Sequence, residues 1–429
     1  MLFKDVTVLQ ADGTVLPHTW VGVTGSRISY VGPEQGAPAD GQAVEGRGRL
    51  LMPGMVNAHT HVPMTLMRGY GEDIPLQDWL EKRIFPFEDQ LDDEAVYWSS
   101  LAGIAEMLAS GTTSFSDMYY HCDAIVSAVE QSGIKANIAR SLSCTDPEKK
   151  LADVPAYREA ERLLNDWRGH ERICADVSVH AEYTILPPFM EGMAELAQRY
   201  HARMEVHLSE TRREHETCIA RYGMTPTALM DKTGILSVPT TAAHCVWLTG
   251  EDVACLRERG ATMVYCAKSN AKLGSGIAPA ARYLQQGLSV AIGTDSAASN
   301  NLLDMFEEAR FGALIAKASG CDCCALPTRQ VLYMATRAGA LSQGRADCGD
   351  VRVGYRADLL LLDTHTVSML PGYDLPANWL YAAGRHCLDM TMVNGEILYQ
   401  NGAYTTIDIE RVCFELERQT EKILQKLQK

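Results

Sequence analysis

Between residues 52 and 349 the chain repeats one pattern, a short apolar run rich in β-branched residues followed by a longer stretch of helical character. Such alternation is typical of repeated βα units, which build parallel sheets. Eight runs predict strands, namely Leu51 to Asn57, Thr113 to Ser116, Ala136 to Ala139, Asp176 to Val179, Arg203 to Val206, Thr240 to Ala243, Thr262 to Tyr265 and Ser289 to Ile292. Eight parallel strands are what a closed barrel requires. The sequence therefore predicts an α/β fold with a (β/α)8 TIM-like barrel over residues 52–349.

The two ends of the chain have a different sequence pattern, in which short segments of alternating apolar residues are separated by turn residues. Val6 to Leu9 and Met390 to Val393 are examples, and such segments indicate small antiparallel strands. Because chain ends usually lie close together, we expect residues 1–51 and 350–405 to form one small β-sandwich. Residues 406–429 are predicted to form a C-terminal helix, since apolar residues recur there at helical spacing among charged ones.

Composition excludes several kinds of partner. The net charge is −15 and no run rich in Lys or Arg occurs, so we expect no nucleic acid partner. No apolar stretch approaches the length of a membrane span and no targeting segment is apparent, so we expect no membrane association. The 13 cysteines are an odd, scattered set, which favours reduced thiols in a cytoplasmic protein. A homo-oligomer is expected.

Histidine and aspartate residues follow the predicted strands directly. His59 and His61 come after the first strand, and alternate residues at a strand end point the same way. The other strand-end residues of this kind are His180, His207, His244 and Asp295. Catalytic groups of barrel enzymes gather at these strand ends. Imidazoles with one carboxylate suit Zn²⁺ and related divalent ions, so the sequence predicts a hydrolytic metal site.

Four motifs carry a resemblance to a known family. Pro53 to His61, His207 to Glu210, His244 with Cys245, and Gly293 to Ser296 resemble the amidohydrolase superfamily over most of the chain. Within that superfamily, four further segments resemble the S-adenosylhomocysteine/5'-methylthioadenosine deaminase group, namely Leu76 to Leu80, Pro86 to Glu88, Ser269 to Pro279 and Ser299 to Phe306.

The resemblance implies one divalent metal ion per chain, held by His59, His61, His207 and Asp295. Zinc is the first choice, and Fe²⁺ or Mn²⁺ suits the same donors. Binuclear members of the superfamily use a carboxylated lysine at the end of strand four, whereas this strand ends at His180 without a lysine. A single ion is therefore expected.

The same resemblance implies roles for the remaining site residues. Glu210 would move a proton from the attacking water to the purine ring nitrogen. His244 would orient the water, and Asp295 would also accept its proton. Glu88, Arg140 and His180, together with Glu210 and Asp295, would contact the substrate. Glu88 is suited to accept two hydrogen bonds from a ribose diol, and Arg140 to pair with the carboxylate of a homocysteine tail.

The implied activity is hydrolytic deamination of 5'-methylthioadenosine, S-adenosylhomocysteine or adenosine to the inosine analogue and ammonia. Other readings stay open: hydrolysis of s-triazines or chloro-aromatics, deamination of guanine or pterins, and a non-catalytic scaffold. Arg68 to Asp73 and Tyr265 to Lys268 depart from the group's usual pattern and leave substrate choice open. The cysteines 321, 323 and 324 are expected to lie in a reduced loop rather than in a metal site.

Overall fold

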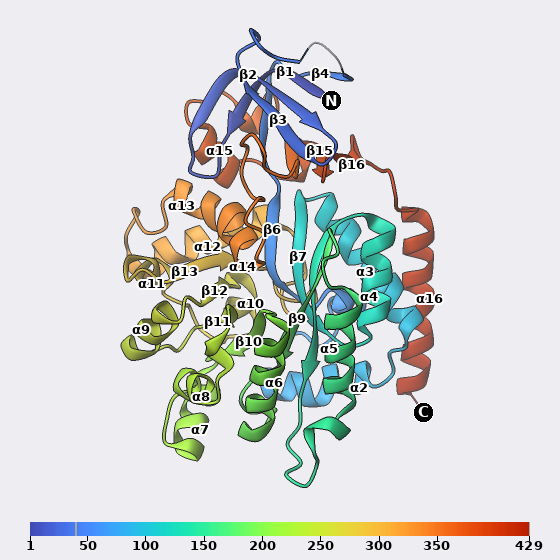
Figure 1. Ribbon diagram of the computed structural model, residues 1–429, viewed down its shortest axis with the longest axis vertical. Coiled ribbons are helices and arrows are strands. Elements are labelled where there is room, and N and C mark those ends of the chain that lie inside the picture. Colours follow the sequence, from blue (N-terminus) through green and yellow to red (C-terminus); the bar gives the residue numbers. More distant parts are fainter. Residues whose placement is uncertain (39–40, 429) are drawn as a thin grey trace.

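The computed structural model describes residues 1–38 and 41–428 and has two parts, a barrel and a sheet beyond one end of it (Figure 1). The barrel strands are β6 (Met55–Thr60), β7 (Thr112–Tyr119), β8 (Lys135–Leu142), β9 (Ile173–Val179), β10 (Met204–Leu208), β11 (Thr240–His244), β12 (Thr262–Tyr265) and β13 (Ser289–Ile292). They are parallel and follow one another in chain order. At the closing seam the Asp295 amide donates to the His59 carbonyl over 3.0 Å. The predicted eight-stranded barrel is confirmed.

Helices surround this barrel. The longer ones are α3 (Asp93–Leu108), α4 (Cys122–Ser132), α5 (Pro155–Asp166), α6 (Pro187–Tyr200), α7 (Arg212–Tyr222), α9 (Gly250–Glu258) and α12 (Met305–Gly320). The shorter ones are α1 (Leu76–Trp79), α2 (Phe85–Glu88), α8 (Pro226–Lys232), α10 (Ala267–Lys272), α11 (Ala280–Gln285), α13 (Thr328–Tyr333), α14 (Gly339–Ser342) and α15 (Leu375–Tyr381). Because helices cover them outside and side chains fill the inside, β6 and β7 are buried throughout.

Both chain ends contribute to one mixed sheet of nine strands. Its strands are β1 (Leu2–Leu9), β2 (Val15–Thr24), β3 (Arg27–Gly32), β4 (Ala43–Glu45), β5 (Arg49–Pro53), β14 (Leu359–Asp363), β15 (Leu388–Val393), β16 (Glu396–Gln400) and β17 (Ala403–Tyr404). The two ends meet where β5 pairs with β14 in antiparallel fashion, with Leu51 opposite Leu361. The expectation that the termini join in one β-rich unit is confirmed.

The predicted first strand, Leu51 to Asn57, is in fact two strands in two different sheets. β5 belongs to the terminal sheet and β6 to the barrel, and Gly54 lies between them. The Gly54 amide donates to the Asp358 carbonyl of the terminal sheet over 2.9 Å. A Cβ at Gly54 would lie 2.2 Å from Thr113 side-chain atoms, so only glycine fits this crossing point.

The C-terminal segment forms helix α16 (Ile409–Leu427), which lies along α3 on the outside of the barrel (Figure 1). Its buried residues include Val412 and Ile423, as the apolar spacing predicted. Over the described ranges, no helix combines the length and the apolar character needed to cross a membrane.

Candidate active site

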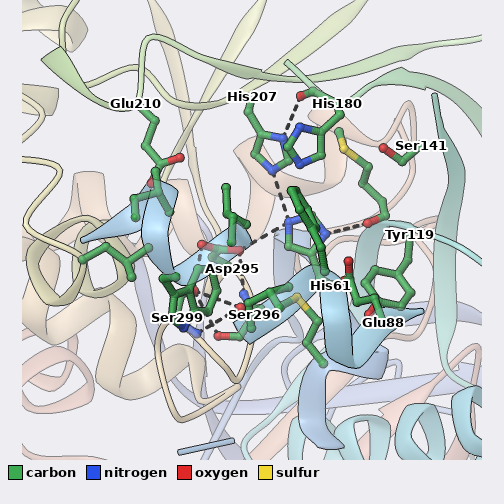
Figure 2. A pocket seen from close by; sticks show the side chains of 18 of the residues that line it. His61, Glu88, Tyr119, Ser141, His180, His207, Glu210, Asp295, Ser296 and Ser299 are labelled. Carbon is green, nitrogen blue, oxygen red and sulfur yellow. Dashed lines mark hydrogen bonds and ion pairs between the residues drawn. The ribbon is translucent and has the colours of Figure 1, made fainter. Parts of the chain in front are cut away.

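Three histidines and one aspartate converge at the carboxyl ends of the barrel strands (Figure 2). His59 and His61 come from β6, His207 from β10, and Asp295 from the loop after β13. The ligand atoms of the three histidines lie within 4.8 Å of one another. Asp295 Oδ1 lies 3.5 Å from His61 Nε2 and 3.9 Å from His59 Nε2. The four side chains share one small space.

The imidazole tautomers at this point fit a bound cation. His61 Nδ1 faces the Met118 carbonyl at 2.5 Å and His207 Nδ1 faces the His180 carbonyl at 2.7 Å, so both Nδ1 atoms carry hydrogen. In the neutral rings each Nε2 then holds a lone pair, although the two Nε2 atoms are 3.1 Å apart. His59 Nε2 is buried and has no hydrogen-bond partner among the described residues.

Burial keeps the rings of His59 and His207 neutral, because it lowers the pKa of both well below the usual range. Lone pairs that face one another in a buried site require a positive charge between them. Imidazole nitrogens and one carboxylate are the donors that zinc and related ions prefer. The residues present therefore fit a divalent metal ion.

Asp295 is held as a carboxylate by its neighbours. Ser269 and Ser299 donate to Oδ2 over 2.6 and 2.9 Å, and the Ser296 amide donates to Oδ1 over 2.6 Å. Burial alone would raise the pKa of Asp295, but the nearby histidines, His61 foremost, hold it below its usual value. The ionised Oδ1 is the oxygen that faces His59 and His61.

Glu210 and His244 form a second pair in the same space. Glu210 Oε2 lies 3.8 Å from His244 Nε2, and Ser275 donates to Glu210 Oε1 over 3.0 Å. His244 Nδ1 faces the Asn270 side-chain oxygen at 2.8 Å, which fixes the ring. Burial raises the pKa of Glu210, the direction expected for a general acid-base group. Burial would lower the pKa of His244, but the Glu210 and Asp295 charges outweigh it and raise that pKa.

The backbone of Glu210 is fixed by the start of helix α7. Glu214 Oε2 accepts hydrogen bonds from the amides of Glu210 and Thr211, over 2.8 and 3.2 Å. Thr211 in turn caps the helix, since its hydroxyl accepts the Glu214 amide over 3.1 Å. The helix cap and the orientation of Glu210 therefore depend on the same carboxylate.

A pocket opens from these residues to the surface, with about 610 Å³ of empty space of which part is open solvent. Its apolar wall consists of Met64, Leu76, Trp79, Leu80, Ile84 and Phe85. Glu88, at the end of α2, lies beside Tyr119 on another side (Figure 2). Burial raises the pKa of Glu88 to about 7. The pocket thus combines a metal-binding floor, an apolar wall and a separate carboxyl group.

His180 and Arg140 are placed differently with respect to this pocket. The His180 ring lines it, with its centroid 4.8 Å from that of His207. Arg140 is not among the lining residues found in the described chain. Its Nε donates to Glu159 over 2.5 Å, and its guanidinium lies 5.1 Å from the ring centre of Tyr120, which does line the pocket. Arg140 thus lies behind the pocket wall, whereas the other predicted site residues meet at the pocket and its floor.

Comparison with known proteins identifies the family to which this site belongs. The model of the amidohydrolase family matches residues 50–398. The chain belongs to the amidohydrolase family. It is 40% identical over 429 residues to a 5-methylthioadenosine/S-adenosylhomocysteine deaminase of Moorella thermoacetica, covering 98% of this chain and 99% of the relative. The corresponding protein of Caldanaerobacter subterraneus is 38% identical, with 99% and 98% covered.

Solved structures agree with this assignment. An adenosine deaminase from Xanthomonas campestris with bound zinc superposes with a TM-score of 0.94 at 32% identity, covering 99% of this chain and 98% of that one. An atrazine chlorohydrolase from Arthrobacter aurescens, complexed with zinc, superposes with a TM-score of 0.91 at 22% identity, covering 98% of this chain and 99% of that one. At that identity the second likeness shows the shared fold alone.

Several polar residues of this amidohydrolase site were missed by sequence reasoning. Ser269 and Ser299 bind Asp295, Asn270 binds His244, and Ser275 binds Glu210. All four lie in the segments Ser269 to Pro279 and Ser299 to Phe306, which carried the family resemblance. The family resemblance of these segments pointed to the right part of the chain. It did not identify the residues, because short polar side chains that position other groups follow no characteristic spacing.

Proposed function

We propose that this amidohydrolase is a metal-dependent deaminase of adenine-type nucleosides, which converts them to the inosine analogue and releases ammonia. The preferred substrates are 5'-methylthioadenosine and S-adenosylhomocysteine, followed by adenosine. One observation carries the proposal: a buried acid, Glu210, lies beside the histidine and aspartate cluster, while Glu88 lies in the same pocket. The deaminase names of its relatives support it.

We assign one divalent ion to His59, His61, His207 and Asp295, with zinc first and Fe²⁺ or Mn²⁺ compatible. Bound zinc in the deaminase of Xanthomonas campestris supports this choice. Such an ion, when bound, lowers the pKa of water from 15.7 toward about 7 and makes it a nucleophile. The carbonyls of Met118 and His180 orient two of the histidines toward it.

Glu210 moves the protons of the reaction. As a carboxylate it takes one proton from the attacking water, and as an acid it delivers this proton to the purine ring nitrogen, which makes the ring carbon more electrophilic. His244, held by Asn270, orients the water, and Asp295 accepts its second proton on the way to the leaving ammonia. The raised pKa of Glu210 favours its uptake of the proton from the water.

The rest of the pocket selects a nucleoside. Glu88 accepts hydrogen bonds from the two ribose hydroxyls, and His180 contacts the purine. The apolar wall around Trp79, Leu80 and Phe85 suits the thioether at the 5' position. Arg140 is assigned to the tail carboxylate of S-adenosylhomocysteine, a contact that requires it to leave Glu159 because it does not line the pocket. A homo-oligomeric state and a cytoplasmic location remain predictions.

The test is kcat/KM for ammonia release from adenine, adenosine, 5'-methylthioadenosine, S-adenosylhomocysteine, guanine and an s-triazine. We expect the 5'-substituted nucleosides to lead and adenine to be far poorer, because the free base leaves Glu88 buried and unpaired. Glu88→Ala should impair the nucleosides much more than adenine. A preference for guanine or a triazine over every nucleoside would show that the substrate assignment is wrong. If no compound is turned over while metal is bound, the alternative of a non-catalytic scaffold protein would be favoured.

A further inference from the structure

A cluster of exposed thiols lies outside the active site, in the loop that follows helix α12. Cys321, Cys323 and Cys324 are all exposed, and Asp322 stands among them. Helix α12 begins at Met305, shortly after Ser299 of the active site, and its 16 residues place the loop about 24 Å further along. The deamination chemistry uses none of these side chains.

The loop has a defined conformation. Lys317 Nζ donates to the carbonyls of Cys323 and Ala325, over 2.8 and 2.6 Å. The Cys324 amide donates to Asp322 Oδ1 over 2.8 Å, which holds the aspartate against the turn. Cys321 adopts the left-handed conformation that ends the helix, with φ of 48°. The donor atoms are therefore gathered by the backbone before any ligand is bound.

The distances within this cluster suit a thiophilic ion. Cys323 Sγ and Cys324 Sγ are 4.0 Å apart, and their sulfurs lie within 4.8 Å of an Asp322 carboxylate oxygen and of each other. Two thiolates bound to one tetrahedral ion at 2.3 Å have sulfurs about 3.8 Å apart. Cys321 is exposed on the same short loop, but its thiol faces the Ala318 carbonyl at 3.8 Å and does not belong to this group of donors.

We propose that residues 322–324 bind a thiophilic divalent cation of the Zn²⁺ and Cd²⁺ class through the Cys323 and Cys324 thiolates and the Asp322 carboxylate. This site is separate from the catalytic ion, whose donors are imidazoles and one carboxylate. The proposal replaces the sequence-based expectation of a simple reduced loop, because sequence alone gives neither the distance between the sulfurs nor the hydrogen bonds that fix the turn.

The test is a Cd²⁺ titration of the full-length, metal-loaded enzyme with a non-thiol reductant present. Sulfur-to-cadmium charge transfer absorbs in the ultraviolet, and the catalytic donor set contains no sulfur, so this band reports cadmium bound to cysteine and not the catalytic site. We expect a band that saturates at one Cd²⁺ per chain. The double variant Cys323→Ser/Cys324→Ser should lose it, and Asp322→Asn should weaken binding.

Cys413→Ser is the matched control, since Cys413 is also an exposed cysteine but lies on helix α16. It should leave the band unchanged. Deaminase turnover should be the same in all these variants, which shows that each is folded. The absence of a saturable band in the unmodified enzyme, or a band that persists in the double variant, would overturn the proposal.

Discussion

At the scale of single residues, the surroundings of Glu210 explain why one carboxyl group can both take up and deliver a proton. Burial raises its pKa, while Ser275 and the nearby His244 keep it oriented. Glu210→Gln keeps the size and the Ser275 contact but cannot carry the proton. We expect turnover to fall by about 10² or more, the usual scale of general acid-base assistance, with the metal content unchanged. Turnover close to the unmodified enzyme would rule out this role.

The proposed role of Glu88 in substrate binding predicts a pH dependence of its own. Its pKa is raised to about 7 by burial, so it loses its charge as the pH falls through about 7. Only the carboxylate accepts from both ribose hydroxyls, so kcat/KM for adenosine should decline on the acid side of pH 7. In the Glu88→Gln variant this part of the decline should disappear, and kcat/KM for adenosine at high pH should be lower than in the unmodified enzyme. If kcat/KM of the variant declines on the acid side of pH 7 just as in the unmodified enzyme, the decline belongs to another group.

Arg140 can be tested through its partner. Because Glu159 holds its guanidinium, Glu159→Gln should release Arg140 and raise kcat/KM for S-adenosylhomocysteine relative to 5'-methylthioadenosine. Arg140→Ala should lower the same ratio. If neither variant changes the ratio of the two substrates, Arg140 does not reach the tail carboxylate and only supports Tyr120 from behind.

The site residues show which parts of a site a sequence reveals. His59 and His61 were predictable because alternate residues at a strand end share a direction, and Asp295 because it directly follows a buried strand. The contacts of Ser275 with Glu210 and of Asn270 with His244 were not predictable, since each joins elements that are distant in sequence. The location of Arg140 depended on Glu159, a helix residue whose proximity no local pattern indicates.

At the scale of elements, the first turn of α7 links folding to catalysis. Thr211→Ala removes only the helix cap and should cost about 1 kcal/mol of stability, with turnover nearly unchanged. Glu214→Ala removes the cap partner and also the acceptor of the Glu210 amide, so it should lower turnover several-fold as well. Glu214→Gln retains an acceptor oxygen and should recover most of that turnover.

Denaturant unfolding and steady-state kinetics separate the two effects. Equal turnover in the Thr211→Ala and Glu214→Ala variants would show that Glu214 acts on helix stability alone.

The elements were predictable where a local pattern determines them. Buried β-branched runs revealed the barrel strands, and the helical spacing of apolar residues revealed α16. The division of Leu51 to Asn57 into β5 and β6 was hidden, because a continuous apolar run does not show that its halves belong to different sheets. Glu88 was placed by a π-helical turn, Leu80–Ile84, between α1 and α2, a geometry without a distinctive sequence period.

At the scale of the whole molecule, one buried ion pair joins the barrel to the terminal sheet. Lys135, at the start of β8, is 1% exposed and Asp358, just before β14, is 4% exposed, with Nζ and Oδ2 2.5 Å apart. Asp358 Oδ1 also accepts the Asn394 amide over 2.8 Å, and its carbonyl accepts the Gly54 amide. The crossing of the chain between the two sheets is therefore fixed around this pair.

Removing one partner of this pair should be far more harmful than removing both charges. Lys135→Met leaves a buried carboxylate unpaired and should cost about 3 to 5 kcal/mol of stability. Adding Asp358→Asn removes that charge while keeping an acceptor for the Asn394 amide, so the double variant should recover much of the loss. Thermal and urea unfolding of the metal-loaded single and double variants give the coupling energy directly. Turnover of the folded fraction should stay unchanged, because Lys135 lies at the opposite end of β8 from Ser141, about 20 Å along the strand. Strictly additive losses would mean that the two parts of the molecule are held together by their apolar contacts, not by this pair.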